Sequence, residues 1–165
     1  MIDESTLIKE GVLRVAELMA ISAKTAPKAK GIDNIVTIVL HEKKELEKLA
    51  RKMEELAPEL GRFFKRDADN VRNSDAVVII GAKVVNLGIK TPKSYPIDVN
   101  TAMALVNLGI ALGSAVKTAS LHNVDNRIMY TIGVAAKELG IVDADFIIGI
   151  PLSAKAKNIY FDRKY

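Results

Sequence analysis

Hydrophobic residues recur along this chain in two spacings, which separate the predicted helices from the predicted strands. A spacing of three or four residues marks one face of a helix, whereas a short run of β-branched residues is typical of a buried strand. The helical spacing predicts helices within residues 4–24, 46–56, 59–74, 99–120 and 126–139. The short runs predict an interior strand at 35–40, strands at 76–82 and 146–150, and a short strand at 159–161. This alternation predicts a layered α/β or α+β domain.

Prolines and aspartates set the predicted ends of these elements. Pro27 is expected to end the first helix, because proline disfavours helical geometry in the preceding residue. Pro58 and Pro151 are expected to end the second helix and the third strand in the same way. Asp98 and Asp125 precede apolar runs and are predicted to be N-caps of helices, since a short acid can accept the first free backbone N–H groups.

The helix predicted after Asp98 is the most apolar segment of the chain. Residues 102–116 are apolar on nearly every side, which predicts a helix buried all round. A membrane span is the alternative, but the run falls about five residues short of the ~20 required, contains Asn107 and ends at Lys117. We therefore expect no membrane insertion. Gly109 and Gly113 have the spacing of close helix packing, which makes a subunit interface a reasonable expectation.

Length and composition limit the possible functions. A chain of 165 residues is predicted to form a single domain, residues 1–165. It contains no cysteine, which excludes disulfides, thiolate zinc sites and cysteine-ligated iron–sulfur clusters. With only two histidines, we predict no metal site.

Charge and the first residues suggest a location. The net charge is +4 and both signs are interleaved, so no nucleic-acid partner is expected. The first residues resemble neither a secretory nor a mitochondrial signal, and we expect a cytoplasmic protein. The many lysines and glutamates, with no cysteine, glutamine or tryptophan, favour a thermophilic source.

Two lysine-bearing loops are candidate anion sites. The sequence Ala-Pro-Lys-Ala-Lys carries Lys28 and Lys30, and Ser-Ala-Lys-Ala-Lys carries Lys155 and a second lysine. Paired ammonium groups on small-residue backbones suit a phosphate, although solvated surface lysines are the more ordinary explanation of the spacing. The same alternative applies to Arg163 near the end of the chain.

The polar segment 122–127 is predicted to be a turn between two helices. In this turn Asn123 would adopt left-handed geometry and Arg127 would bind a neighbouring carboxylate. A ligand site is the alternative. His122 has no identifiable nucleophile or orienting acid, so no catalytic residues are assigned.

Four segments, at 25–39, 63–81, 107–141 and 143–164, resemble an archaeal and bacterial family of uncharacterised proteins with a ferredoxin domain. In that family a cysteine-rich segment, expected to hold an iron–sulfur cluster, lies between the second strand and the central helix. The corresponding residues here, 84–97, contain no cysteine. The resemblance therefore implies a member that has lost the cluster segment, and an electron-carrier role cannot be carried over.

A more distant resemblance is to flavin-dependent nitroreductases. Residues 26–34 fall on their A-P-S-x-x-N-x-Q-P segment, 105–114 look like their central helix, and 149–151 look like their G-Y-P turn. The resemblance implies a nitroreductase-like α+β fold, a layered sandwich with a small mixed sheet and a buried central helix. It also implies a homodimer that binds flavin mononucleotide (FMN) at its interface.

By this resemblance Lys28 and Lys30 would lie near the flavin, and Arg163 would reach its phosphate. The chain departs from the pattern because it lacks the N-terminal arginine pair, and Gly31 and Asp33 replace an asparagine and a glutamine. An acid at that position is unfavourable beside the flavin unless a lysine compensates its charge. Our first hypothesis is a homodimeric domain that binds FMN or a related anionic ligand in a redox role. The alternative is a non-enzymatic dimer or complex subunit without a cofactor.

Overall fold

The computed structural model describes residues 1–161 and contains helices on both faces of a four-stranded sheet. The helices are α1 (Glu4–Thr25), the short 3-10 helix η1 (Ala29–Gly31), α2 (Lys43–Leu60), α3 (Phe63–Arg72), α4 (Val99–Leu121) and α5 (Tyr130–Glu138). The strands are β1 (Ile35–Leu40), β2 (Ala76–Ala82), β3 (Asp125–Asn126) and β4 (Phe146–Ser153). They are ordered β1-β2-β4-β3, and every pairing is antiparallel. The prediction of a mixed sheet was therefore wrong.

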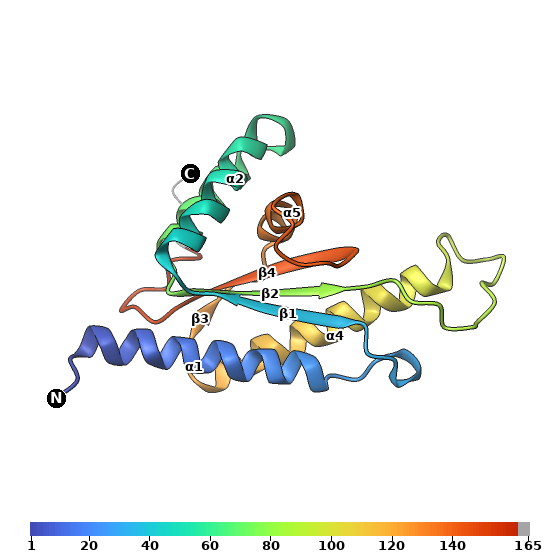
Figure 1. The fold of residues 1–165 in the computed structure, drawn as a ribbon, viewed down its shortest axis with the longest axis horizontal. Helices are drawn as coiled ribbons and strands as arrows, with labels where there is room; N and C mark the ends of the chain where they lie inside the picture. The colour runs from blue at the N-terminus through green and yellow to red at the C-terminus, as the bar shows by residue number, and fades with distance from the viewer. Residues whose placement is uncertain (162–165) are drawn as a thin grey trace.

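The sheet separates two hydrophobic cores. Figure 1 shows α1 and α4 on one face of the sheet and α2 and α5 on the other. All seven residues of β2 are buried, as the unbroken apolar run predicted. The α+β class and the predicted positions of β1 and β2 are confirmed.

The strand predictions were wrong in three places. β1 is an edge strand, not an interior one, since within residues 1–161 it pairs with β2 alone. Pro151 lies inside β4 and does not end it. Gly149 exchanges hydrogen bonds with Met129, so the nitrogen of Pro151, two residues on, points to that same side and away from β2. Residues 159–161 form a turn and no strand.

The helix starts were predicted correctly in one case and incorrectly in the other. Asp98 caps α4 by accepting the N–H groups of Asn100 and Thr101, both at 3.0 Å. Asp125 caps no helix, because it forms β3 opposite Ser153. The following helix begins at Tyr130 and is shorter than predicted.

Helix α4 is not buried all round. The side chains of Leu105, Val106 and Ile110 are exposed, and a Cβ built on Gly109 or Gly113 would meet no atom within 4 Å. Among residues 1–161, α4 alone is long and apolar enough to span a membrane, and 39% of its most apolar window is buried in the protein. One side of α4 is therefore an open apolar face, which we call the α4 outer face: Leu105, Val106, Gly109, Ile110 and Gly113.

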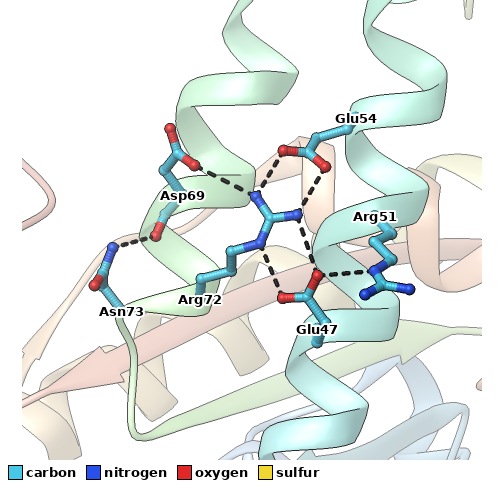
Figure 2. Close-up of polar contacts among 6 residues, drawn as sticks. All are labelled: Glu47, Arg51, Glu54, Asp69, Arg72 and Asn73. Carbon is cyan, nitrogen blue, oxygen red and sulfur yellow. Dashed lines mark hydrogen bonds and ion pairs between the residues drawn. The ribbon is translucent and has the colours of Figure 1, made fainter.

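Helix α3 packs against α2, and Arg72 joins the two helices. Figure 2 shows the Arg72 guanidinium between two carboxylates of α2: it donates to Glu54 at 2.6 and 2.7 Å and to Glu47 at 2.9 Å. Glu47 also accepts a hydrogen bond from Arg51, one helical turn further along α2, at 2.8 Å. Hydrogen bonds from Arg72 lower the pKa of Glu54, and those from Arg72 and then Arg51 lower the pKa of Glu47.

We expect Arg72→Gln to lower the Tm by roughly 2–4 °C at pH 7, and by less at pH 3. A carboxyl whose pKa is lowered by folding stabilises the native state above its ordinary pKa of 4.5, and this contribution is lost as the pH falls through the lower folded value. Thermal melts between pH 7 and pH 3 test this. Arg51→Gln, at a 71% exposed side chain, is the control and should change the Tm much less. An equal loss at both pH values in Arg72→Gln would contradict the ion-pair explanation.

Candidate functional site

The predicted lysine loop, residues 26–34, follows the end of α1. The Ala26 N–H donates to the Ser22 carbonyl and closes the helix before Pro27. The Lys28 ammonium turns back and donates to the carbonyl oxygens of Lys24 and Ala26, the latter at 2.8 Å. Lys28 therefore caps the C-terminus of α1, where the helix dipole favours a positive charge.

The tip of the loop has left-handed backbone geometry. Lys30 and Gly31 have φ angles of 55° and 66°, and a Cβ on Gly31 would meet no atom within 4 Å. The Lys30 ammonium donates to the carbonyl of Leu87 at 2.9 Å, although its side chain is exposed. This bond joins the lysine loop to the segment between β2 and α4.

Two buried asparagines anchor the loop to the sheet and to α4. Asn107 accepts the Ala29 N–H at 3.0 Å and donates to the side-chain oxygen of Asn34 at 3.0 Å. Asn34 in turn donates to the carbonyl of Lys83 at 2.7 Å, and both asparagines are 3% exposed. Sequence reasoning missed this role for Asn107, although a single amide within the apolar run 102–116 was an available signal.

The charge of Asp33 is compensated within the loop. Lys24 forms an ion pair with Asp33. This hydrogen bond is the main reason that the pKa of Asp33 lies below its ordinary value. An acid at this position requires a compensating lysine, and Lys24 in the last turn of α1 provides it.

The structure brings only part of the predicted site together. Lys28, Lys30 and Asp33 share one loop before β1, at the sheet end where Ile35 pairs with Ala82. Lys155 lies beyond β4 at the opposite end, roughly 20 Å of strand away, and donates to the carbonyl of Asn73. Arg163 lies outside the described residues.

The segment 122–127 is a turn only at His122 and Asn123, because Asp125 and Asn126 form β3. Among residues 1–161, Arg127 binds no carboxylate. Asn123 has the expected left-handed geometry, with a φ of 55°. Arg127 donates to the Tyr160 carbonyl at 2.9 Å, and its guanidinium carbon lies 5.2 Å from the ring centroid of Phe161. Arg127 therefore fixes the C-terminal segment to the turn.

Residues 1–161 also contain a cavity relevant to ligands, and no candidate metal site. No group of three or more histidine, aspartate or glutamate side chains in this range could hold a metal ion. A separate apolar groove of about 330 Å³ lies between α4, α5 and β4, with Leu105, Tyr130 and Phe146 in its lining. It does not include the lysine loop.

Both lysines of the loop keep N–H donors that their bonds to carbonyls do not use. A lysine ammonium has three N–H donors, so Lys28 keeps one and Lys30 keeps two after their bonds to carbonyls. These donors lie on a backbone that is open at Gly31 and held in place by the two asparagines. The loop can bind an anion, but it holds no side chain placed for acid–base catalysis.

Comparison with known proteins gives a family. Residues 97–163 match the model of the family described as uncharacterized proteins containing a ferredoxin domain (DUF2148). An uncharacterized protein of Archaeoglobus fulgidus is 44% identical over 99% of this chain and 97% of its own length.

Solved structures share the fold at low identity. A Desulfitobacterium hafniense nitroreductase with bound FMN has a TM-score of 0.62 and 16% identity, over 87% of this chain and 78% of its own. A putative NAD(P)H:FMN oxidoreductase of Staphylococcus epidermidis has a TM-score of 0.63 and 13% identity, over 93% and 81%. The hypothetical oxidoreductase YcnD of Bacillus subtilis has a TM-score of 0.60 and 12% identity over 88% of this chain. The chain spans only 58% of that protein. At such identities the likeness shows the nitroreductase-like fold alone.

Proposed function

This chain belongs to the family of uncharacterized proteins containing a ferredoxin domain, and we propose that it is a homodimeric, cytoplasmic protein that binds FMN in a redox role. The proposal rests on the nitroreductase-like fold together with the phosphate-binding capacity of the lysine loop. When bound, a flavin supplies the electron-transfer chemistry, and the protein binds and orients it. Few catalytic side chains are then needed, in agreement with their absence from the loop.

The observation that carries the proposal is the construction of the lysine loop. Lys28 and Lys30 are each held at one end by backbone carbonyls and keep three donors between them for an anion. Asn34 and Asn107 fix the backbone between them. The negative charge of Asp33, which would oppose a phosphate, is neutralised by Lys24.

The α4 outer face supports the homodimer. It is apolar, carries no charge between Leu105 and Gly113, and has open space at both glycines, so the helix of a second copy can approach closely. A two-fold dimer uses the same patch on both subunits. Because the α4 outer face carries no charged side chain, its two copies would not repel each other across the axis. Asn107 lies on the same helix as this face, so a dimer here would lie close to the lysine loop.

We expect the protein to gain thermal stability with FMN, and the double variant Lys28→Gln/Lys30→Gln to bind FMN at least about 10-fold more weakly. The reason is that hydrogen bonds to a charged group contribute about 1.5–3 kcal/mol, which corresponds to a factor of ten or more. Titration of FMN fluorescence and thermal shifts at several FMN concentrations measure the effect. Riboflavin, which lacks the phosphate, should bind the wild type and the variant equally.

Lys43→Gln/Lys44→Gln is the matched control, since it removes the same charge from exposed lysines at the start of α2. It should change the Kd for FMN by less than about 2-fold. These lysines follow β1 whereas the lysine loop precedes it, and salt screens the interaction between charges at opposite ends of a strand. A wild-type protein that neither gains stability with FMN nor carries a flavin spectrum would rule out the proposed cofactor.

A second candidate function, a non-enzymatic dimer or complex subunit, is favoured by the same α4 outer face. It requires the apolar contact but no cofactor. Light scattering together with the FMN titration separates the two. A dimer that binds FMN supports the first function, and a dimer without FMN binding supports the second. A monomer would contradict both.

A further inference from the structure

The segment between β2 and α4 is an exposed loop with an unusual composition. From Val84 to Ile97 it contains two lysines, Lys90 and Lys93, and no acidic residue. Figure 1 shows it projecting beyond the end of the sheet, on the side where the η1 loop also lies. From Gly88 to Asp98 every residue is exposed except Thr91, which is half-buried. We call residues 88–97 the projecting loop.

The projecting loop exposes apolar side chains next to its lysines. Ile89, Tyr95 and Ile97 are 47%, 49% and 43% exposed. In the part of the chain that the structure describes, neither Lys90 nor Lys93 forms a hydrogen bond or an ion pair. Apolar groups surrounded by uncompensated positive charges are typical of a docking surface for an acidic partner.

The loop is held in shape by its own hydrogen bonds. Thr91 accepts the Val99 N–H at 3.0 Å, and the Tyr95 N–H donates to the Pro92 carbonyl at 3.0 Å. At its base, the buried Leu87 donates its N–H to Asn100 at 3.0 Å. A surface fixed in this way loses little conformational entropy on binding, which favours recognition of a partner.

The same base touches the proposed flavin loop. Leu87 accepts a hydrogen bond from Lys30 at 2.9 Å, so a protein docked on the projecting loop would lie beside the proposed FMN site. The family is described as proteins that contain a ferredoxin domain, whereas this chain has no cysteine to ligate an iron–sulfur cluster. This chain therefore has no cysteine-ligated cluster that could relay electrons to a flavin.

We propose that the projecting loop docks a small acidic one-electron carrier protein of the ferredoxin class, an inference that rests on the proposed function. Two carriers docking in succession would each give up one electron, and a bound FMN would supply the acceptor for both electrons and one proton from solvent. The three apolar side chains contact the centre of the carrier surface, while Lys90 and Lys93 pair with carboxylates around it. An anionic membrane would also attract such a loop, but contact with the flavin loop matters only for a redox partner.

The experiment measures binding of an acidic [4Fe–4S] ferredoxin to the full chain loaded with FMN, by calorimetry at low and at high salt. We expect Lys90→Glu/Lys93→Glu and Ile89→Ser/Tyr95→Ser each to raise the Kd at least 10-fold. Lys44→Glu/Lys48→Glu, which changes the net charge equally on α2, should raise it less than 2-fold. High salt should weaken wild-type binding, and a basic cytochrome should not bind.

Three results would overturn the inference: an undetectable complex with the wild type, an equal loss in the α2 control, or an unchanged Kd in the loop variants. Binding of the wild type to anionic lipid vesicles, lost in the loop variants while ferredoxin stays unbound, would assign the loop to a membrane. The FMN thermal shift is read separately, and it should be unchanged in the loop variants. Its absence in the wild type would refute the proposed function, whereas its presence without ferredoxin binding would refute the docking alone.

Discussion

Gly133→Ala is expected to lower the free energy of unfolding by about 3 kcal/mol or more. A Cβ at this position of α5 would lie 1.8 Å from the carbonyl oxygen of Ile147 and 2.5 Å from its carbon. Both atoms belong to the backbone of β4, so no side-chain rotation relieves the clash, and α5 must move away from the sheet. Gly149 in β4 is equally close to Ile132 of α5, which shows how tightly the two elements pack.

Gly11→Ala is the matched control for this prediction. Gly11 also lies within a helix, but its Cβ would meet no atom within 4 Å. The same substitution should therefore stabilise the protein by up to about 1 kcal/mol, since alanine is the better helix former. Urea unfolding of the three proteins measures both effects. Equal free energies of unfolding for Gly133→Ala and the wild type would show that α5 packs less closely on β4 than described.

The sequence predicted elements well where local pattern and burial coincide. β2 is apolar throughout and buried throughout, and its bounds were predicted to the residue. β1 was also placed correctly, but its edge position was not, because strand order depends on pairings that a local pattern does not contain. Pro151 misled for a related reason, since a proline is tolerated in a strand wherever its nitrogen points to an unpaired side.

The position of the lysine loop between α1 and β1 was predicted from sequence, but its contacts were not. The lysine loop was identified from Pro27, the two lysines and the following strand. The partners of that loop lie far along the chain: Leu87 is 57 residues from Lys30 and Asn107 is 73 residues from Asn34. Likewise, the composition of α4 could not show which side faces the core, and its open face emerged only from the packing of α1 and the sheet.

Asn107→Ala is expected to destabilise the protein by about 2–4 kcal/mol, because it leaves the Ala29 N–H and the buried Asn34 side chain without their partners. Asn107→Leu should cost a similar amount although it restores the volume, which separates lost hydrogen bonds from a cavity. Ser114→Ala, a polar-to-apolar change on the same helix, should have an effect within about 0.5 kcal/mol. Chemical unfolding curves at pH 7 measure all three.

The same variants connect the fold to the proposed ligand. Asn107 holds the backbone between Lys28 and Lys30, so Asn107→Ala should also weaken FMN binding under conditions where the variant is still folded. In a double-mutant cycle, Asn34→Ala should lower the free energy of unfolding little further once Asn107→Ala is present. The coupling energy between the two substitutions should be about 0.5–3 kcal/mol. Weaker FMN binding without loss of stability would place Asn107 in contact with the ligand. Lower stability with unchanged FMN affinity would instead show that the anion does not depend on the loop that Asn107 holds, and the proposed position of the phosphate would have to be given up.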